Sequence, residues 1–507
     1  MELSEVSKLM PLKVNPYEHQ IKAFEFVCGL FGIFSSSYYS RGAALLMEMG
    51  CGKTITSIAI SGCLYQSGKI NKILIVAPVS ILDVWEEEYN KFANFPYTLT
   101  LLKGSCSEKA EMLQEISDEG LQIVVVNYES AWRIERELLI FNADLIIADE
   151  GHKIKSPQAS ASKCMHSLGD RARYKLLLTG TLITNNETDV FSQYRFVNSD
   201  LFGTSFYAFK NNYFDMLGYG NHTPVLRKCM RDNFLKKLHS IAYRVTKTEC
   251  LDLPKITEVV RIIKLESKTM KLYSNLEKEL YTQIVGSEVS AVNILTKNLR
   301  LSQITGGHFT DAEGNDNVVS TAKLEAFSEI VDSALLEGKK LVVMARFIPE
   351  LNDIQKLLDE KGVEYSVVRG GIKNRGEEIR RFQENEACKV FVGQIAASGL
   401  GITLTSASMM VFYSIDYSMS NFEQAKARIH RVSQKENCIY IYLVAKNTVD
   451  CKAFRSLCRK ADLAELLIDD YRKSHNSLGE LYNRNLLGKR YVKNPVKSIL
   501  LEVIRSG

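Results

Sequence analysis

The chain has 507 residues, of which 46% are hydrophobic and 24% charged, a composition typical of a soluble globular protein with room for about three domains. Residues 1–16 do not resemble a signal peptide, and no apolar run approaches the length of a membrane span. The eleven cysteines form no CxxC pair and no cluster at zinc-ligand spacing. We therefore expect an intracellular protein with reduced thiols, no membrane partner and no structural zinc.

The net charge of +5 is unevenly distributed. Residues 471–507 carry eight Lys and Arg against Glu480 and Glu502, a net charge of +6. A second basic stretch, residues 227–247, carries seven Lys and Arg against Asp232. Each stretch is either a solvated face or a surface for the phosphate backbone of a nucleic acid, and charge alone leaves both alternatives open.

The first predicted helix begins near Gln20, within the sequence Pro-Tyr-Glu-His-Gln at residues 16–20. A glutamine amide carries a donor and an acceptor and can therefore pair with the edge of an adenine. The alternative is an ordinary polar residue at the start of a helix.

An apolar run then breaks into a glycine-rich turn and a helix, within LLMEMGCGKTIT at residues 45–56. This pattern predicts a phosphate-binding loop, because backbone N–H groups at a helix start face phosphates, Lys53 adds a positive charge and the Thr54 hydroxyl can hold Mg²⁺. Met47 stands where the usual pattern has glycine, and a chance glycine-rich turn is the alternative. The predicted ATP contacts of this loop are Met47, Glu48, Met49, Gly50, Cys51, Gly52, Lys53 and Thr54.

Three short apolar strands are predicted at residues 72–78, 98–104 and 122–129, with helical segments between them. Strands that alternate with helices in this way indicate βαβ units and a parallel sheet covered on both faces.

The next predicted strand runs directly into Asp149 and Glu150. Ligands of parallel sheets bind at the carboxyl ends of the strands, so we assign Asp149 to Mg²⁺ and Glu150 to the attacking water. A further strand ends in the hydroxyl-bearing residues Thr179 and Thr181, which are placed either to sense a γ-phosphate or to form a plain turn.

Residues 187–320 lack the regular alternation of strands and helices and are predicted to form mainly aromatic and basic helices. They contain a Leu-Asp-Leu-Pro linker at residues 251–254 and one strand-like run at residues 257–265. We expect a helical insertion between two α/β lobes. The predicted domains are a first lobe at 1–190, the insertion at 191–322, a second lobe at 323–470 and a basic tail at 471–507.

The second predicted lobe regains the βα rhythm but has no phosphate loop, so we expect it to supply groups to the nucleotide of the first lobe. Gln424, Arg428 and Arg431 are spaced i, i+4 and i+7, which predicts one helix face. Two arginines beside a glutamine can bind phosphate oxygens as arginine fingers, and a solvated stripe is the alternative.

A second glycine-rich turn precedes that predicted helix and follows a strand. It contains Gln394, Ser398 and Gly401, and its glycines allow close approach to a nucleic-acid backbone or to the ATP site.

Seven short motifs follow one another along the chain: PYEHQ, MGCGKT, IVAP, DEGH, LTGT, SGLGITLT and QAKARIHRVSQ. In this order they resemble the Swi/Snf-type ATPases of helicase superfamily two, over roughly residues 15–460. The short ASGLGITLT version is similar to the compact annealing-helicase and phage or bacterial branch. The resemblance implies an α/β fold of two RecA-like parallel-sheet lobes in tandem, ATP and Mg²⁺ between them, and hydrolysis stimulated by DNA.

The resemblance also implies roles for single residues, through the motifs that they match. Gln20 would bind adenine, while Gly52, Lys53 and Thr54 would bind phosphates and Mg²⁺. Asp149 and Glu150 would catalyse hydrolysis, and the second lobe would complete the site through Gly401, Gln424, Arg428 and Arg431. Residues that fall at DNA-facing or lobe-coupling motifs are Trp85, Tyr128, Gln394 and Ser398.

Our hypothesis from the sequence is a DNA-dependent ATPase that translocates on duplex or branched DNA and remodels forks or drives branch migration. Replication or recombination proteins are candidate partners, and the expected location is bacterial or phage-infected cytoplasm, or the nucleus in a eukaryote. The alternatives are a strand-separating DNA or RNA helicase, a motor subunit of a restriction or defence complex, and an ATP-gated DNA clamp.

Overall fold

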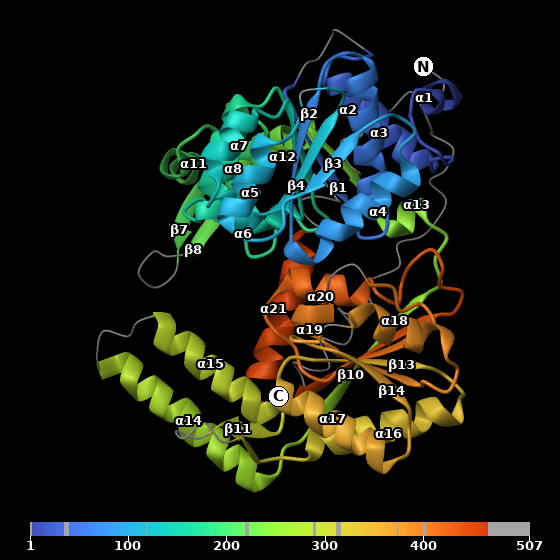
Figure 1. Cartoon of the computed structure of the whole chain (residues 1–507). Helices are drawn as coiled ribbons and strands as arrows, with labels where there is room; N and C mark the ends of the chain where they lie inside the picture. Colours follow the sequence, from blue (N-terminus) through green and yellow to red (C-terminus); the bar gives the residue numbers. More distant parts are fainter. Residues whose placement is uncertain are drawn as a thin grey trace, which may run out of the picture. The chain divides into compact units, whose positions relative to one another are not determined.

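The computed structural model describes residues 3–34, 40–117, 119–217, 223–286, 291–310, 316–372, 374–398 and 402–464 (Figure 1). Two compact units divide between Leu251 and Asp252. The described residues up to Leu251 form unit 1, and those from Asp252 to Ala461 form unit 2. Within the described ranges, every helix is too short or too polar to cross a membrane.

Unit 1 is built on a sheet, of which Figure 1 labels the strands β1 to β4. Seven described strands pair in parallel, in the order β3-β4-β2-β5-β6-β1-β9. The central strands are runs of Ala, Leu, Ile and Val that are buried along nearly their whole length, as expected for a parallel sheet with both faces covered. Because all strands run the same way, their carboxyl ends gather at one edge. The strands are β1 Gly42–Met47, β2 Lys72–Ala77, β3 Thr98–Leu101, β4 Gln122–Asn127, β5 Leu145–Asp149, β6 Tyr174–Leu178 and β9 Ala242–Val245.

The helices of unit 1 connect these strands and pack on the sheet. They are α1 Leu3–Lys8, α2 Glu18–Leu30, α3 Lys53–Gln66, α4 Leu82–Phe92, α5 Cys106–Gln114, α6 Tyr128–Ala131, α7 Glu135–Phe141, α8 Ser160–Arg171, α9 Asp189–Val197, α10 Ser199–Phe202, α11 Phe206–Tyr213, α12 Arg231–Ser240 and α13 Lys247–Cys250. An antiparallel pair, β7 Phe214–Leu217 and β8 Thr223–Leu226, stands apart from the main sheet.

Unit 2 contains a second parallel sheet, of which Figure 1 labels the strands β10, β13 and β14. The described strands have the order β10-β17-β16-β13-β15-β14. Its strands are β10 Ile256–Ile263, β13 Leu341–Ala345, β14 Tyr365–Val368, β15 Val390–Gln394, β16 Met409–Phe412 and β17 Cys438–Ala445. Its helices are α16 Ala322–Leu336, α17 Ile348–Glu360, α18 Arg375–Glu384, α19 Ile395–Ser398, α20 Met419–Lys426 and α21 Val449–Ala464. The tandem RecA-like α/β fold predicted from the sequence is therefore confirmed.

Two further helices, α14 Ser267–Gly286 and α15 Ala291–Thr305, pack against each other in unit 2 (Figure 1). A short antiparallel pair, β11 His308–Thr310 and β12 Asp316–Val318, follows them. This part of the chain corresponds to the helical part of the predicted insertion.

The structure differs from the predicted domain boundaries at 190 and 322. Residues 242–245, predicted within a helix, form β9 and pair with β1 of the unit 1 sheet. The strand-like run near residue 257 forms β10 and pairs with β17 of unit 2. The middle segment is therefore shared between the two sheets, because each of these strands finds its partner nearly 200 residues away in sequence. The boundary between the units falls in the Leu-Asp-Leu-Pro segment at 251–254.

Candidate nucleotide-binding site

The turn between β1 and α3 forms the predicted phosphate loop. Gly50 and Gly52 adopt φ of +88° and +83°, a left-handed conformation that residues with a Cβ rarely adopt. A Cβ on Gly52 would lie 2.1 Å from the Gln20 side-chain nitrogen. Glycine at this position therefore satisfies both the backbone conformation and the close approach of a neighbouring side chain.

Lys53 is the first residue of α3, and its Nζ donates a hydrogen bond to the Met47 carbonyl at 3.0 Å. Thr54 follows it in the first turn and is partly buried. The loop is also held by His19, whose Nε2 lies 2.8 Å from the Cys51 carbonyl oxygen. Burial lowers the pKa of His19.

Gln20, the predicted adenine contact, is buried beside this loop. Its Oε1 accepts a hydrogen bond from the Tyr17 backbone N–H at 2.9 Å, which fixes the start of α2. Its side-chain amide nitrogen lies against Gly52, since a Cβ on Gly52 would be 2.1 Å from it. The structure thus brings Gln20 and the phosphate loop together.

The paired carboxylates lie at the same edge of the sheet as the loop. Asp149 is the last residue of β5 and is in register with Leu178 of β6, which in turn is in register with Leu45 of β1. Glu150 adopts a left-handed conformation with φ of 51°. Both carboxylates are buried.

The Asp149 carboxylate accepts two hydrogen bonds. Its Oδ1 accepts the Glu150 backbone N–H at 2.9 Å, and its Oδ2 accepts the Trp85 indole N–H at 3.0 Å. Burial and the neighbouring charge of Glu150 raise the pKa of Asp149 to about 7, while Lys53 acts in the opposite direction. Lys53 follows the carboxyl end of β1 and Asp149 ends β5, so both lie at the same edge of the parallel sheet.

Trp85 and Tyr128 do not fit the predicted DNA-facing positions. Their side chains are 1% and 3% exposed, so neither can stack on a base in this conformation. The Tyr128 hydroxyl donates to the Asp149 main-chain carbonyl at 2.7 Å. Both side chains instead lie behind the paired carboxylates, because α4 and α6 turn them into the core of unit 1.

The turn after β6 lies against the phosphate loop. A Cβ on Gly180 would be 3.4 Å from the Met47 carbonyl oxygen. The Thr181 N–H donates to the Thr179 hydroxyl at 3.1 Å, so this hydroxyl is part of a local turn.

Sequence reasoning missed the support that β9 gives to the loop. The Arg244 side chain is nearly buried and donates to the carbonyls of Leu46 and Gly180, at 3.2 and 3.4 Å. It also pairs with Glu48, which accepts the Lys247 backbone N–H at 2.9 Å. The strand-favouring Tyr and Val of Ala-Tyr-Arg-Val were the available signal. Within the basic stretch at 227–247, Arg244 is nearly buried, whereas Lys228 and Lys236 are exposed.

In unit 2, the structure corrects the predicted arginine helix. The helix α20 ends at Lys426, so Arg428 and Arg431 lie in the turns that follow it, while Gln424 is on the helix. Beyond the end of the helix, the Arg428 carbonyl accepts the Leu404 N–H, and the Gln434 side-chain amide donates to the Ile429 carbonyl.

The two arginines instead bind the segment after the second glycine-rich turn. The buried Arg428 guanidinium donates to the Ile402 carbonyl at 3.1 Å. The Arg431 guanidinium donates to the Thr403 hydroxyl at 2.7 Å. Within unit 2, this places both arginines beside the predicted glycine-rich turn.

The other predicted residues of that turn are described only in part. Gln394 ends β15, and its Oε1 accepts the Gly370 N–H at 2.9 Å. Ser398 is the last residue of α19. Gly401 lies outside the described residues, as does the basic tail at 471–507.

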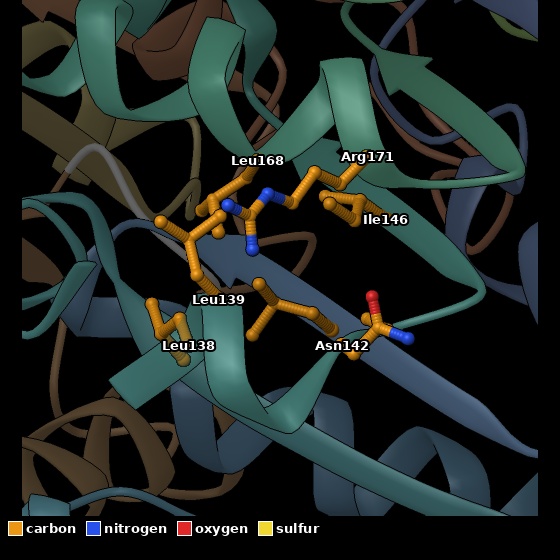
Figure 2. A pocket seen from close by; sticks show the side chains of 8 residues that line it. Leu138, Leu139, Asn142, Ile146, Leu168 and Arg171 are labelled. Carbon is orange, nitrogen blue, oxygen red and sulfur yellow. The ribbon is translucent and has the colours of Figure 1, made fainter. Parts of the chain in front are cut away.

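Unit 1 also contains a small hollow away from the phosphate loop, lined mainly by apolar side chains. Figure 2 shows the Arg171 side chain reaching over leucine side chains from α7 and α8. The lining of the hollow includes none of the predicted site residues. The lining residues are Leu74, Leu138, Leu139, Asn142, Ala143, Ile146, Leu168 and Arg171.

The residues at the phosphate loop fit ATP with Mg²⁺. Mg²⁺ is usually held by one or two protein oxygens together with nucleotide phosphates and water, which matches the Thr54 hydroxyl and the Asp149 carboxylate. Across the described ranges, no three or more His, Cys, Asp or Glu side chains gather as metal ligands. The left-handed glycines and Lys53 supply the groups that phosphates require.

Tandem RecA-like units, the first of which carries a phosphate loop, define the class of this protein. The SNF2-related domain model matches residues 19–307, and the helicase conserved C-terminal domain model matches residues 322–433. The chain belongs to the SNF2-related family, the Swi/Snf-type ATPases of helicase superfamily two.

Two curated relatives span most of this chain. The mouse chromodomain-helicase-DNA-binding protein 1-like is 26% identical over 490 residues, covering 90% of this chain and 52% of the relative. The DNA repair and recombination protein RAD54-like of Drosophila persimilis is 26% identical over 520 residues, covering 92% and 65%. The chain thus spans between about half and two thirds of their lengths.

A solved structure also matches. The Sulfolobus solfataricus SWI2/SNF2 ATPase core in complex with dsDNA has 25% identity and a TM-score of 0.44, covering 93% of this chain and 96% of its own.

Proposed function

We propose that this chain is a DNA-dependent ATP hydrolase that moves along duplex or branched DNA. The observation that carries the proposal is the meeting of Lys53, Asp149 and Glu150 at one edge of the unit 1 sheet. Family membership supports ATP as the nucleotide that is hydrolysed. The names of the two relatives, which refer to DNA binding and to DNA repair and recombination, support DNA as the track.

In this proposal, unit 1 binds and orients the nucleotide. The Lys53 ammonium and the N–H groups at the start of α3 bind phosphate oxygens, and the Gln20 amide binds the adenine. Thr54 and Asp149 hold Mg²⁺, which when bound neutralises charge on the transferred phosphoryl group. Glu150 orients the attacking water and accepts its proton.

Unit 2 supplies positive charge in the proposed mechanism. Arg428 and Arg431 stabilise the charge that develops on the phosphate oxygens in the transition state. Both arginines also bind residues 402–403, next to the turn predicted to approach a DNA backbone. Binding of phosphate by the arginines would therefore alter the contacts that hold this turn. In this way, ATP hydrolysis would change how tightly the turn binds DNA.

The proposal also specifies the form of DNA on which the protein acts. We propose forked or branched duplexes, with fork remodelling or branch migration as the result and replication or recombination proteins as partners. The name of the RAD54-like relative supports a recombination setting. We propose a location in bacterial or phage-infected cytoplasm, or in the nucleus if the source is a eukaryote.

The test is steady-state ATP turnover without nucleic acid and with single-stranded DNA, duplex, forked and four-way DNA, and RNA. We expect duplex-containing DNA to stimulate turnover most, and Lys53→Ala to remove it, because the phosphate loop then lacks its positive charge. Equal turnover with and without all DNAs would contradict a DNA-dependent motor. Stimulation by RNA or by single strands alone would favour a strand-separating helicase instead.

A further inference from the structure

Two aromatic side chains from separate elements bind the same residue of the nucleotide site. Trp85 comes from the middle of α4 and Tyr128 from the start of α6. The first donates to the Asp149 carboxylate and the second to the Asp149 main-chain carbonyl. Neither aromatic residue is within 20 residues of Asp149 in the sequence.

The Trp85 contact fixes the orientation of a carboxylate. With the indole N–H on Oδ2 and the Glu150 N–H on Oδ1, each carboxylate oxygen is held by one donor. The indole is 1% exposed and its ring centroid lies 6.2 Å from that of Tyr89, so packing holds the donor in place. An indole N–H buried here without an acceptor would be costly, so packing and hydrogen bond favour the same carboxylate orientation.

The Tyr128 contact fixes the backbone at the same point. Its hydroxyl lies 2.7 Å from the Asp149 carbonyl oxygen, immediately before the left-handed Glu150. A left-handed non-glycine residue is unfavourable unless its surroundings hold it. Tyr128 is therefore placed to hold the main chain that presents both carboxylates.

We propose that Trp85 is a positioning residue for the Asp149 carboxylate, and that its indole reports when Mg²⁺ and nucleotide bind that carboxylate. The inference rests on the proposed role of Asp149 in holding Mg²⁺. Residues that orient metal ligands commonly change metal affinity or activity by 10- to 100-fold when they are replaced. A purely structural role in the core would instead be met by any aromatic ring of similar shape.

The first test is the Mg²⁺ dependence of hydrolysis in Trp85→Phe, which keeps an aromatic ring but removes the N–H. We expect the Mg²⁺ concentration for half-maximal turnover to rise about 10-fold, with a nucleotide KM at saturating Mg²⁺ close to that of the wild type. Tyr89→Phe is the matched control, since it removes a buried polar atom from the same helix away from Asp149. An unchanged Mg²⁺ requirement in a folded Trp85→Phe protein would overturn the proposal.

The second test does not require Trp85 to be replaced. The chain has two tryptophans, and Trp132 is 40% exposed, so Trp132→Phe leaves Trp85 as the only indole. We expect Trp85 emission to change when ADP is added with Mg²⁺ but not with ADP and a chelator. The change should be lost when Asp149→Ala is added to this background.

Calorimetry of ADP binding to the same protein separates the possible failures. Bound Mg²⁺ and ADP without any change in Trp85 emission would overturn the role of Trp85 and leave the proposed ATP site standing. A chain that binds no ADP would overturn the ATP site and the role of Trp85 together.

Discussion

Gly52 is important both for the backbone conformation of the phosphate loop and for the proposed binding of nucleotide. Its φ of +83° and the 2.1 Å approach of the Gln20 nitrogen to an ideal Cβ both exclude a side chain. We predict that Gly52→Ala costs about 1–2 kcal/mol of unfolding free energy from backbone strain, and further binding loss because the Gln20 amide must move. Urea unfolding and ADP calorimetry measure the two effects.

The variant Gly68→Ala distinguishes backbone strain from the steric clash with the Gln20 amide. Gly68 also has positive φ, +64°, but a Cβ there meets nothing within 4 Å. Gly68→Ala should therefore lose stability while ADP affinity stays at the wild-type value. Equal ADP affinity in Gly52→Ala and Gly68→Ala would show that the contact between Gly52 and Gln20 has no part in binding.

Asp149 gives the site a pH dependence. Its pKa of about 7 lies above its ordinary value, so the protonated form is favoured below that pH and competes with Mg²⁺. We predict that the Mg²⁺ concentration needed for half-maximal hydrolysis rises as the pH falls towards and below neutrality, because a growing share of Asp149 is then protonated. A raised acid pKa also means that this group lowers folding stability as pH rises from 3.8 towards 7, since the unfolded chain releases the proton first.

Magnesium titrations of turnover at about pH 6, 7 and 8 measure this competition. An identical Mg²⁺ requirement at all three would contradict the assignment of Asp149. Far-UV circular dichroism at each pH shows that the protein remains folded.

At the scale of single residues, the sequence predicted Lys53, Asp149 and Glu150 because each lies within a few residues of the turn that places it. The resemblance placed Trp85 and Tyr128 at motifs that face DNA or couple the lobes. The direction of their side chains depends on how α4 and α6 pack on the sheet, which short-range pattern does not specify. A hydrogen bond between residues 64 positions apart in the chain follows only from tertiary structure.

The elements of unit 1 that sequence reasoning identified are those with long apolar runs. The strand β9 was missed because its four residues follow a helix and carry Arg244 in the middle. Pairing with β1 makes it a strand, since the arginine is satisfied by carbonyls of neighbouring segments and by Glu48. Tertiary contacts therefore outweigh local helical propensity there.

The early end of α20 changes what the arginines can do. Arg428 is buried with its guanidinium on the Ile402 carbonyl, whereas Arg431 is partly exposed and bound to Thr403. We predict that Arg431→Ala reduces ATP turnover about 10³-fold with little loss of stability, as removal of an arginine finger does. Arg428→Ala should reduce turnover and also lower the unfolding free energy, because a buried charge-assisted hydrogen bond is lost.

Steady-state turnover and urea unfolding of both variants test this division. Arg380→Ala is the matched control, because Arg380 is an exposed arginine on α18 of the same unit. Wild-type turnover in Arg431→Ala would show that this guanidinium does not reach the nucleotide.

At the scale of the whole molecule, the alternation of strands and helices was enough to predict two parallel α/β units. The boundaries were wrong because β9 and β10 lie in a stretch dominated by helices. A predicted insertion thus contributes one edge strand to each sheet. Where a chain divides depends on long-range strand pairing, which local periodicity does not report.

The basic tail at 471–507 is predicted from its charge to contact DNA. It lies outside the described residues, and its net charge of +6 rests on the sequence alone. We predict that neutral substitutions across 472–497 weaken DNA binding equally for all sequences and flatten its dependence on salt, since fewer counterions are released. An unchanged salt slope in DNA-binding titrations would identify the tail as a solvated surface.

The central claim is that hydrolysis takes place where the phosphate loop meets the paired carboxylates. The most direct measurement is steady-state ATP turnover on duplex DNA by Glu150→Gln, beside wild type and the exposed control Glu111→Gln. We predict that Glu150→Gln still binds ADP but loses turnover, because the attacking water is no longer oriented and deprotonated, while Glu111→Gln behaves as wild type. Wild-type turnover in a folded Glu150→Gln protein would contradict the account.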